Sequence, residues 1–301
     1  MVTEKYQRIL VPLDGSQQAE IVLPYVTGLM NRFGPEVHLL HVCDAGHGAS
    51  LFMCQSYVER VAELISRRAG AAPGVKTNAI TGDAAGGILD YARETGADLV
   101  LIASHGNSGR QWLLGGVALK VLSASKVPVL LVRKPLPEKP SGPKWPSVII
   151  VPLDGSLTSE YVLPFVDAFA RHDSELAIVL LRVCEPPDLL TDYPEAVMPH
   201  TWDKHVKLSR ENAEKTCAVY LTGKQESLKD AGARVKVEVA LGDRPTDSII
   251  DRAAKDPLAL IAMTTHGASG ISRWPYGHVA DRILLATENP LLLVRPPKPE
   301  R

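Results

Sequence analysis

The chain has no excess of charge, no long apolar run and few cysteines, and each shortage excludes a class of protein. Its formal net charge is −1, so neither a nucleic-acid backbone nor an anionic membrane surface is an expected partner. No apolar run approaches the ~20 residues that cross a bilayer. The first residues, MVTEKYQR, contain no apolar segment that resembles a signal peptide. We therefore expect a cytoplasmic protein without nucleic-acid or membrane partners.

The few cysteines exclude a disulfide scaffold. They are Cys43, Cys54, Cys184 and Cys217. No two of them form a Cys-x-x-Cys motif. Cys43 and Cys184 each follow a strand-like apolar segment, and we interpret them as small buried apolar residues rather than redox groups. His41, Cys43 and His47 have ligand atoms for zinc, but no fourth ligand is evident, so we expect no metal site.

The chain does contain an internal repeat. The segment VPLDGS occurs at residues 11–16 and again at 151–156. Four further blocks match in the same order, and the last pair is KVPVLLVRKP (126–135) and ENPLLLVRPP (288–297). Matched blocks in one order indicate two homologous halves. A length of 301 residues agrees with two domains, each long enough to bury a core.

Each half alternates strand-like and helical segments, which is typical of a parallel sheet covered on both faces. In the first half we expect strands at 8–13, 36–42, 75–81, 98–104 and 127–133. We expect helices at 16–33, 56–69, 87–95 and 117–124. The second half repeats this pattern, with a Pro-rich insertion at 186–207 that we expect to be a surface loop over the sheet's carboxyl edge.

A proline-rich segment separates the halves. KPLPEKPSGPKWP (134–146) contains five prolines and cannot continue a helix or a central strand. We predict a first domain at 1–134, a linker at 135–146 and a second domain at 147–298.

Two features place a ligand crevice at the carboxyl ends of the strands, where such sheets bind ligands. Asp14 and Asp154 directly follow the first strand of each half. Glycine-bearing loops, SHGNSGRQWLLGGV (104–117) and THGASGISRWPYGHV (265–279), follow the fourth strand and end at a helix start, where backbone N–H groups favour an anion. A simpler interpretation stays open, because such loops are often only turns and Asp-Gly-Ser also serves as a turn and helix cap.

These residues resemble the universal stress protein family in its tandem two-domain form. The resemblance rests on VPLDGS, on HLLHV (38–42), on the Gly-Asp turns at 82–83 and 242–243, and on the closing PVLLVR (128–133). It implies two Rossmann-like (adenine nucleotide alpha hydrolase-like) α/β domains, each a five-stranded parallel sheet of order 3-2-1-4-5 with helices on both faces. Family members pair their last strands between subunits, so we expect an intramolecular pseudo-dimer here. Homodimerisation stays open.

Members of the family either bind ATP or do not, and binders carry Gly-x-x-Gly, nine residues, then Gly-Ser or Gly-Thr. The first half departs from that pattern at three places. Ala103 stands at the first glycine, only eight residues separate Gly106 from Gly115, and Gly116 takes the hydroxyl position. The first half therefore lacks a side-chain phosphate donor.

The second half departs less. Thr264 stands at the first glycine and His278 at the hydroxyl position, but nine residues separate Gly267 from Gly277. A protonated histidine adds positive charge, and its unperturbed pKa is about 6.5. We therefore predict that the second half is the better nucleotide site and binds more tightly below about pH 6.5.

The resemblance implies nucleotide-binding residues at the carboxyl edge of each half. In the first half they are Pro12, Leu13, Asp14, Val42, Ala103, His105, Gly106, Gly115, Gly116 and Val117. In the second half they are Pro152, Leu153, Asp154, Val183, Thr264, His266, Gly267, Gly277, His278 and Val279. The function implied is an ATP-binding stress-response sensor or regulator, with Mg²⁺ only alongside ATP. The alternative is a member that binds no nucleotide and acts as an interaction protein or takes another small ligand.

We expect little or no catalysis. The chain has no Gly-x-x-x-x-Gly-Lys-Ser/Thr motif, and neither loop contains a lysine. Ser104 and His105 are adjacent on a strand end and would point to opposite sides, and no Gly-x-Ser-x-Gly elbow is present. We expect His105 and His266 to brace their loops by hydrogen bonds. A slow ATPase is the least supported alternative.

Overall fold

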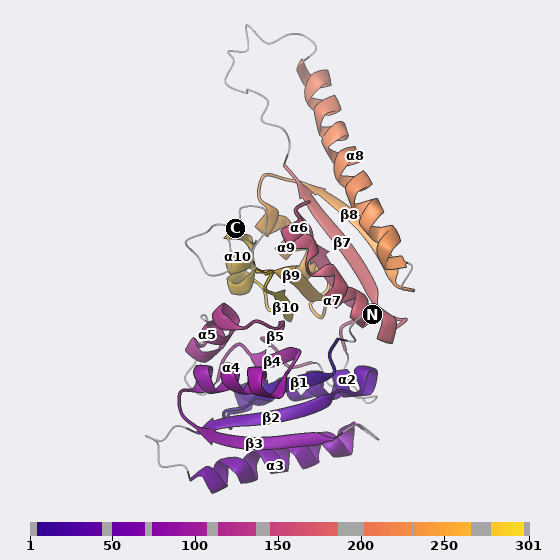
Figure 1. The fold of residues 1–301 in the computed structure, drawn as a ribbon. Coiled ribbons are helices and arrows are strands. Elements are labelled where there is room, and N and C mark those ends of the chain that lie inside the picture. Colours follow the sequence, from indigo (N-terminus) through magenta and orange to yellow (C-terminus); the bar gives the residue numbers. More distant parts are fainter. Residues whose placement is uncertain are drawn as a thin grey trace.

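The computed structural model describes residues 5–43, 50–69, 74–106, 114–136, 145–185, 202–229, 232–265 and 278–297. Helices and strands alternate in both halves (Figure 1). The first half comprises β1 (Arg8–Pro12), α1 (Gln17–Glu20), α2 (Leu23–Phe33), β2 (Glu36–Cys43), α3 (Leu51–Arg68), β3 (Val75–Thr81), α4 (Ala84–Thr95), β4 (Leu99–Ala103), α5 (Gly116–Ala124) and β5 (Val129–Val132). The second half comprises β6 (Val148–Pro152), α6 (Leu157–Glu160), α7 (Leu163–His172), β7 (Ala177–Cys184), α8 (Trp202–Lys229), β8 (Arg234–Leu241), α9 (Pro245–Ala254), β9 (Leu260–Thr264), α10 (His278–Ala286) and β10 (Leu291–Val294).

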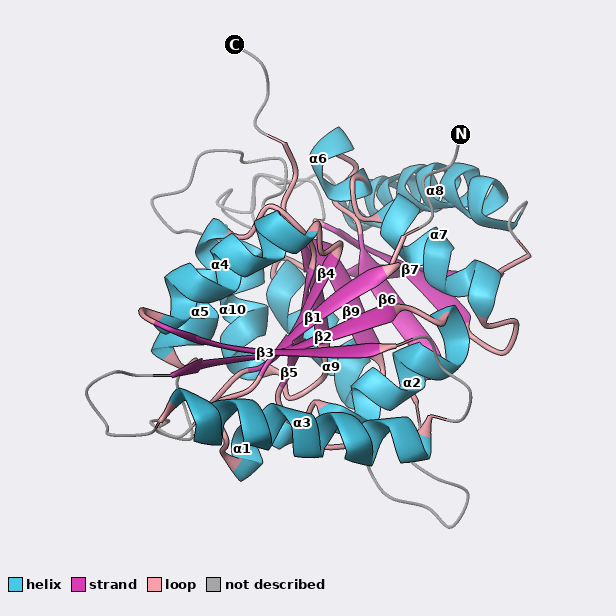
Figure 2. Cartoon of the chain, turned by 60° about the horizontal axis from the view of Figure 1, so that its bottom comes forward, coloured by secondary structure: helices cyan, strands magenta, loops and turns pink. Residues whose placement is uncertain are grey.

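The strands form one ten-stranded sheet in the order β3-β2-β1-β4-β5-β10-β9-β6-β7-β8. Within each half all strand pairs are parallel, because helices connect successive strands. Each half therefore has the order 3-2-1-4-5, and helices lie on both sides of the sheet (Figure 2). The expected fold class is confirmed.

The two halves meet at their last strands. β5 and β10 pair in an antiparallel direction, with Leu130 opposite Leu292 (Figure 1). These two leucines are equivalent in the sequence repeat, so the pairing is symmetric about them and defines a pseudo-twofold axis. The expected pairing of the last strands within one chain is thus confirmed.

Each central strand is buried on both faces. Ile9 and Val11 pack with α2 and α3, whereas Leu10 packs with α4 and α5. The side chains of successive strand residues point to opposite faces. This is why the strand segments read as continuous apolar runs rather than alternating ones.

A second contact joins the halves on the face that carries α2 and α7. The Tyr6 hydroxyl donates a hydrogen bond of 2.9 Å to the carbonyl oxygen of Phe165. The Tyr6 ring lies 4.7 Å from that of Phe169, and the Phe33 ring lies 5.2 Å from that of Phe169. Tyr6 and Phe33 belong to the first half and Phe165 and Phe169 to the second, so one aromatic cluster stabilises both.

Trp145, at the end of the predicted linker, packs onto α2 beside that cluster. A Cβ atom added at Gly28 would lie 2.3 Å from Cε3 of Trp145, so only glycine lets the indole approach this closely. The guanidinium of Arg32 lies 4.9 Å from the Trp145 ring and forms an ion pair of 2.7 Å with Asp173.

Several boundaries differ from expectation, among them the start of α4, which lies at Ala84 rather than at residue 87. The helix expected from residue 16 to 33 divides into α1 and α2, because Pro24 in the first turn of α2 has no N–H to donate to the turn before it. α3 begins at Leu51 rather than 56, since the Ser50 hydroxyl accepts a hydrogen bond from the backbone N–H of Met53. Residues 202–207 lie in α8 and not in a loop, and residues 186–201 are outside the described residues. Among the described helices, none is long and apolar enough to cross a membrane.

Candidate functional site: two crevices at the carboxyl edge

The repeated Asp-Gly-Ser segment forms a turn and a helix cap. The Asp14 carboxylate accepts hydrogen bonds from the backbone N–H of Ser16 at 3.0 Å and from its hydroxyl at 2.5 Å. The Ser16 hydroxyl oxygen in turn accepts from the backbone N–H of Ala19 at 3.1 Å, which caps α1. Gly15 has φ +81°, a conformation that favours glycine. Asp154 and Ser156 repeat this arrangement with distances of 2.9 and 2.6 Å.

In the first half this turn meets the loop that follows β4. A Cβ atom at Gly106 would lie 2.1 Å from the second carboxylate oxygen of Asp14, so a larger residue there would displace that carboxylate. The backbone N–H of Gly115 donates a hydrogen bond of 2.8 Å to the carbonyl oxygen of Ser104. The two described ends of the loop are therefore held together beside Asp14.

The start of α5 lines the same cavity as Asp14 and Gly106. Its N-cap residue, Gly115, offers no side-chain hydrogen bond to the first turn, and a Cβ atom at Gly116 would have nothing within 4 Å. Within the part of the chain that the structure describes, the first backbone N–H groups of the helix therefore have no side-chain cap. Such a helix start favours an anionic group.

The structure gathers the residues predicted for the site. We call the cavity of the first half the first crevice, and all ten predicted residues line it: Pro12, Leu13, Asp14, Val42, Ala103, His105, Gly106, Gly115, Gly116 and Val117. We call the cavity of the second half the second crevice, and it is lined by Pro152, Leu153, Asp154, Val183, Thr264, His278 and Val279. The predicted residues His266, Gly267 and Gly277 lie outside the described residues.

Ser104 and His105 lie closer than expected. The Ser104 hydroxyl and Nδ1 of His105 are 2.8 Å apart, so these side chains do not point to opposite sides. The expectation was wrong because β4 ends at Ala103, and the alternation of a strand no longer applies beyond it. Ser104 is buried, and Nε2 of His105 is buried without a hydrogen-bond partner in the part of the chain that the structure describes.

The two crevices differ in size and charge. The first has a volume of about 110 Å³ and the second about 660 Å³. Arg182 lines the second crevice at the repeat position that His41 occupies in the first half. Its guanidinium lies 4.8 Å from the Tyr220 ring, and its Nη1 is 2.3 Å from where a Cβ atom of Gly155 would be. The second crevice thus has a cation beside the Asp-Gly-Ser turn.

All four cysteines are paired, which sequence reasoning missed. Cys43 at the end of β2 forms a disulfide with Cys54 of α3, with 6.5 Å between their Cα atoms. Cys184 at the end of β7 forms one with Cys217 of α8, with 6.7 Å between their Cα atoms. Cys43 and Cys184 are buried, as expected, but their pairing in disulfides was not predicted.

The sequence did contain a signal for these pairs. CQSY (54–57) and CAVY (217–220) share a Cys-x-x-Tyr pattern. The Tyr57 hydroxyl donates to the Glu20 carboxylate at 3.0 Å, and the Tyr220 hydroxyl donates to Glu160 at 2.8 Å. Burial, helped by the neighbouring carboxylate, raises the pKa of both tyrosines, so they remain donors. The equivalent tyrosines align the two helices despite separations of 11 and 33 residues between the cysteines.

Comparisons with known proteins agree with this architecture. A sequence profile of the Universal stress protein family matches residues 5–133 and 147–295. Universal stress protein MJ0531 of Methanocaldococcus jannaschii is 30% identical over 146 residues, which are 44% of this chain and 85% of that protein. Universal stress protein YxiE of Bacillus subtilis is 26% identical over 147 residues, which are 42% of this chain and 99% of that protein.

A solved structure extends the comparison to the whole chain. A universal stress protein from Archaeoglobus fulgidus, 18% identical in sequence, has a TM-score of 0.67, and the match covers 100% of each chain. This likeness concerns the fold. Because the two profile matches together span most of the sequence, the chain belongs to the universal stress protein family, as two tandem domains.

Proposed function

We propose that the protein is an ATP-binding sensor or regulator of a stress response, that the second crevice is its nucleotide site, and that it has little or no catalytic activity. The observation that carries this proposal is Arg182, a cation that lines a cavity of about 660 Å³ beside Asp154. Small-molecule pockets typically have volumes of about 300–1,000 Å³, apolar walls and a few polar groups that fix orientation.

The second crevice offers a different chemistry to each part of a nucleotide. Its apolar wall includes Val183, Ile249 and Met263, against which an adenine ring can pack. The carboxylate of Asp154 is an acceptor for a ribose hydroxyl. The guanidinium of Arg182 suits a phosphate, because its N–H groups match phosphate oxygens in geometry and charge. Mg²⁺ would arrive only with the phosphates of the nucleotide.

The first crevice favours the alternative function. Its volume of about 110 Å³ is below the usual range for a drug-sized ligand, and its lining within the described residues includes no lysine or arginine. A protein whose first half takes no nucleotide can use that half for contact with a partner or for a smaller ligand.

Two measurements test the proposal. The purified protein is denatured and the supernatant is analysed by mass spectrometry, with ATP as the expected co-purified ligand. ATP is then titrated calorimetrically into the wild type and into the matched variants Val183→Trp and Val42→Trp, which place an indole at equivalent positions in the two crevices. We expect Val183→Trp to weaken binding at least tenfold and Val42→Trp to leave it unchanged, because an indole fills the adenine position only in the second crevice.

The opposite pattern would assign the nucleotide to the first crevice. No ATP in the supernatant and no heat of binding in any protein would favour the interaction-protein alternative. Circular dichroism of both variants checks that each keeps the fold, so that a loss of binding is assigned to the crevice.

A further inference from the structure

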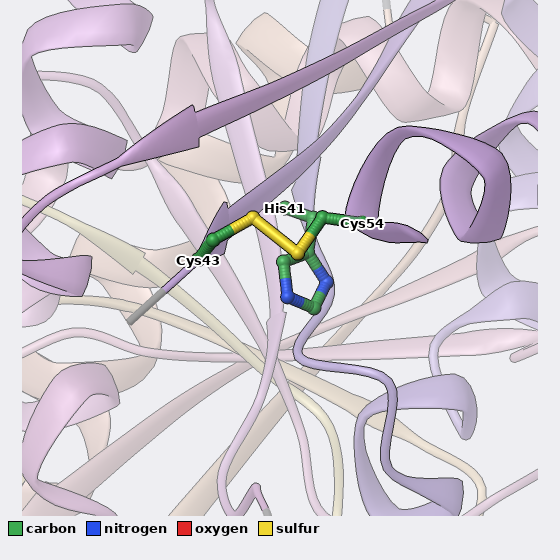
Figure 3. A group of neighbouring side chains, drawn as sticks. All are labelled: His41, Cys43 and Cys54. Carbon is green, nitrogen blue, oxygen red and sulfur yellow. A yellow bond between two sulfur atoms is a disulfide. The ribbon is translucent and has the colours of Figure 1, made fainter. Parts of the chain in front are cut away.

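One nitrogen and two sulfur atoms meet at the carboxyl end of β2 (Figure 3). His41 and Cys43 lie two residues apart on β2, so their side chains share a face, and Cys54 approaches them from the first turn of α3. The three ligand atoms all lie within 4.8 Å of one another. Two cysteines and one histidine form the ligand set of a zinc site that keeps its fourth position open.

His41 contributes a buried polar atom whose hydrogen bonding is not satisfied by the described residues. Nδ1 of His41 is buried and has no hydrogen-bond partner among the residues that the structure describes. Its ring contacts Tyr57 edge to face, with 5.7 Å between ring centroids, which satisfies neither ring nitrogen. A buried nitrogen without a partner destabilises a protein, so a ligand that accepts its lone pair would restore a favourable contact.

The second half supplies a natural comparison. It has an equivalent cysteine pair, Cys184 and Cys217, but Arg182 replaces His41. A guanidinium stays protonated and has no lone pair to donate to a metal. The cysteine pair therefore occurs twice in the chain, whereas the complete set of three ligands described by the structure occurs once.

We propose that, once the Cys43–Cys54 disulfide is reduced, the first half binds one Zn²⁺ through His41, Cys43 and Cys54, with water as the fourth ligand. Reduction adds two electrons and two protons to the disulfide and yields two thiols. A dithiol reductant supplies both and itself becomes a disulfide. Zn²⁺ then displaces the two thiol protons, because thiolates and neutral imidazole are its ligands.

The metal and the disulfide are mutually exclusive states of the same two sulfur atoms. In the reducing cytoplasm that the sequence predicts, thiols are the usual state of such cysteines. Zinc would then hold β2 and α3 together in the reduced protein, as the disulfide does in the oxidised one. Among the described residues of the second half, the disulfide alone joins β7 and α8 in this way.

The test measures zinc stoichiometry on the full chain. The protein is reduced with a phosphine, which is removed under nitrogen, and Zn²⁺ is titrated in competition with a chromophoric chelator. We expect one equivalent for the wild type and one for Cys184→Ser/Cys217→Ser. We expect none for Cys43→Ser/Cys54→Ser and none for the oxidised wild type. His41→Arg, which copies the second half, should weaken binding by at least about 100-fold, the upper range for lost support of a zinc ligand.

Cobalt gives an independent readout of the ligands. Co²⁺ added to the reduced wild type should produce a thiolate-to-metal charge-transfer band, and Cys43→Ser/Cys54→Ser should abolish it while Cys184→Ser/Cys217→Ser keeps it. His41→Gln serves as a second variant if His41→Arg fails to fold, as judged by circular dichroism. No zinc in the reduced wild type, two equivalents in it, or full affinity in both His41 variants would each overturn the proposal.

Discussion

The guanidinium of Arg133 donates a hydrogen bond of 2.8 Å to the carbonyl oxygen of Thr287, across the junction of the two halves. It also donates to the carbonyl oxygen of Leu284, and the equivalent Arg295 donates to the carbonyl oxygen of Ser123 in return. Burial lowers the pKa of Arg133, with Glu288 opposing the shift. Arg133 therefore holds α10 of the second half, and Arg295 holds α5 of the first half.

The first prediction concerns this tie. Arg133→Ala should lower the free energy of unfolding by about 1.5–3 kcal/mol, the range for hydrogen bonds to a charged group. Urea denaturation measures the change. Arg67→Ala is the control, because the Arg67 side chain is 78% exposed and its ion pair with Glu63 spans 3.6 Å. Such surface pairs contribute about 0–1 kcal/mol, so equal losses in the two variants would contradict the proposed role of the junction.

The second prediction concerns the approach of Trp145 to α2. Gly28→Ala should destabilise the protein by about 1–3 kcal/mol, because the new Cβ atom overlaps the indole and the packed interior cannot yield. The same change in a Trp145→Ala background should cost far less, since the overlapping ring is gone. A double-mutant cycle measured by thermal unfolding gives the coupling.

Gly223→Ala is the matched control for that cycle. Gly223 lies in α8 with nothing within 4 Å of an added Cβ atom. Alanine there should stabilise the helix by about 0.5–1 kcal/mol, because it removes the conformational entropy of an exposed helical glycine. Destabilisation at both glycines would show that crowding by Trp145 is not the cause at Gly28.

The third prediction is a pH dependence at the start of β2. Hydrogen bonds from His38, Lys76 and Arg8 lower the pKa of Glu36 from 4.5 to about 2. A depressed carboxyl pKa contributes stability that is fully present above the unfolded value and is lost as pH falls through the folded one. The difference in urea midpoint between wild type and Glu36→Gln should therefore be constant above pH 4.5 and shrink from there towards pH 2. A difference that grows on acidification would contradict this assignment.

The fourth prediction is that ATP is bound without turnover. With Mg²⁺ and ATP present, the purified protein should release no more phosphate than a protein-free control over hours. The described linings of the two crevices include no lysine. Phosphate release that rises with protein concentration and disappears in Val183→Trp would show that the second crevice hydrolyses ATP after all.

The repeat and its turn motifs predicted the fold well, because they report local chemistry. In both copies of Asp-Gly-Ser the glycine adopts a left-handed conformation and the serine caps a helix. The apolar runs around Leu130 and Leu292 similarly indicated strands that are buried on both faces and paired. Such patterns depend only on residues that are neighbours in the sequence, so they can be recognised without information on tertiary contacts.

Features that depend on tertiary contacts were not predictable in the same way. We expected the helix to begin at residue 56, whereas it begins at Leu51 and includes Cys54. The pairing of Cys54 with Cys43 was therefore not predicted. The volumes of the two crevices depend on the distance of the helices and loops from the sheet. The spacing of residues in the sequence does not determine that distance. The sequence shows that Arg182 stands where the first half has His41. Only the structure shows that Arg182 lines a crevice.

The pairing of β5 with β10 within one chain changes how this protein can diverge. In a symmetric homodimer every substitution appears on both sides of the axis, so a gain in one site is copied into the other. Here each side of the axis is encoded separately, and a change at Arg182 leaves His41 untouched. The duplication therefore allows the two halves to diverge separately while the junction around Leu130 and Leu292 keeps them paired.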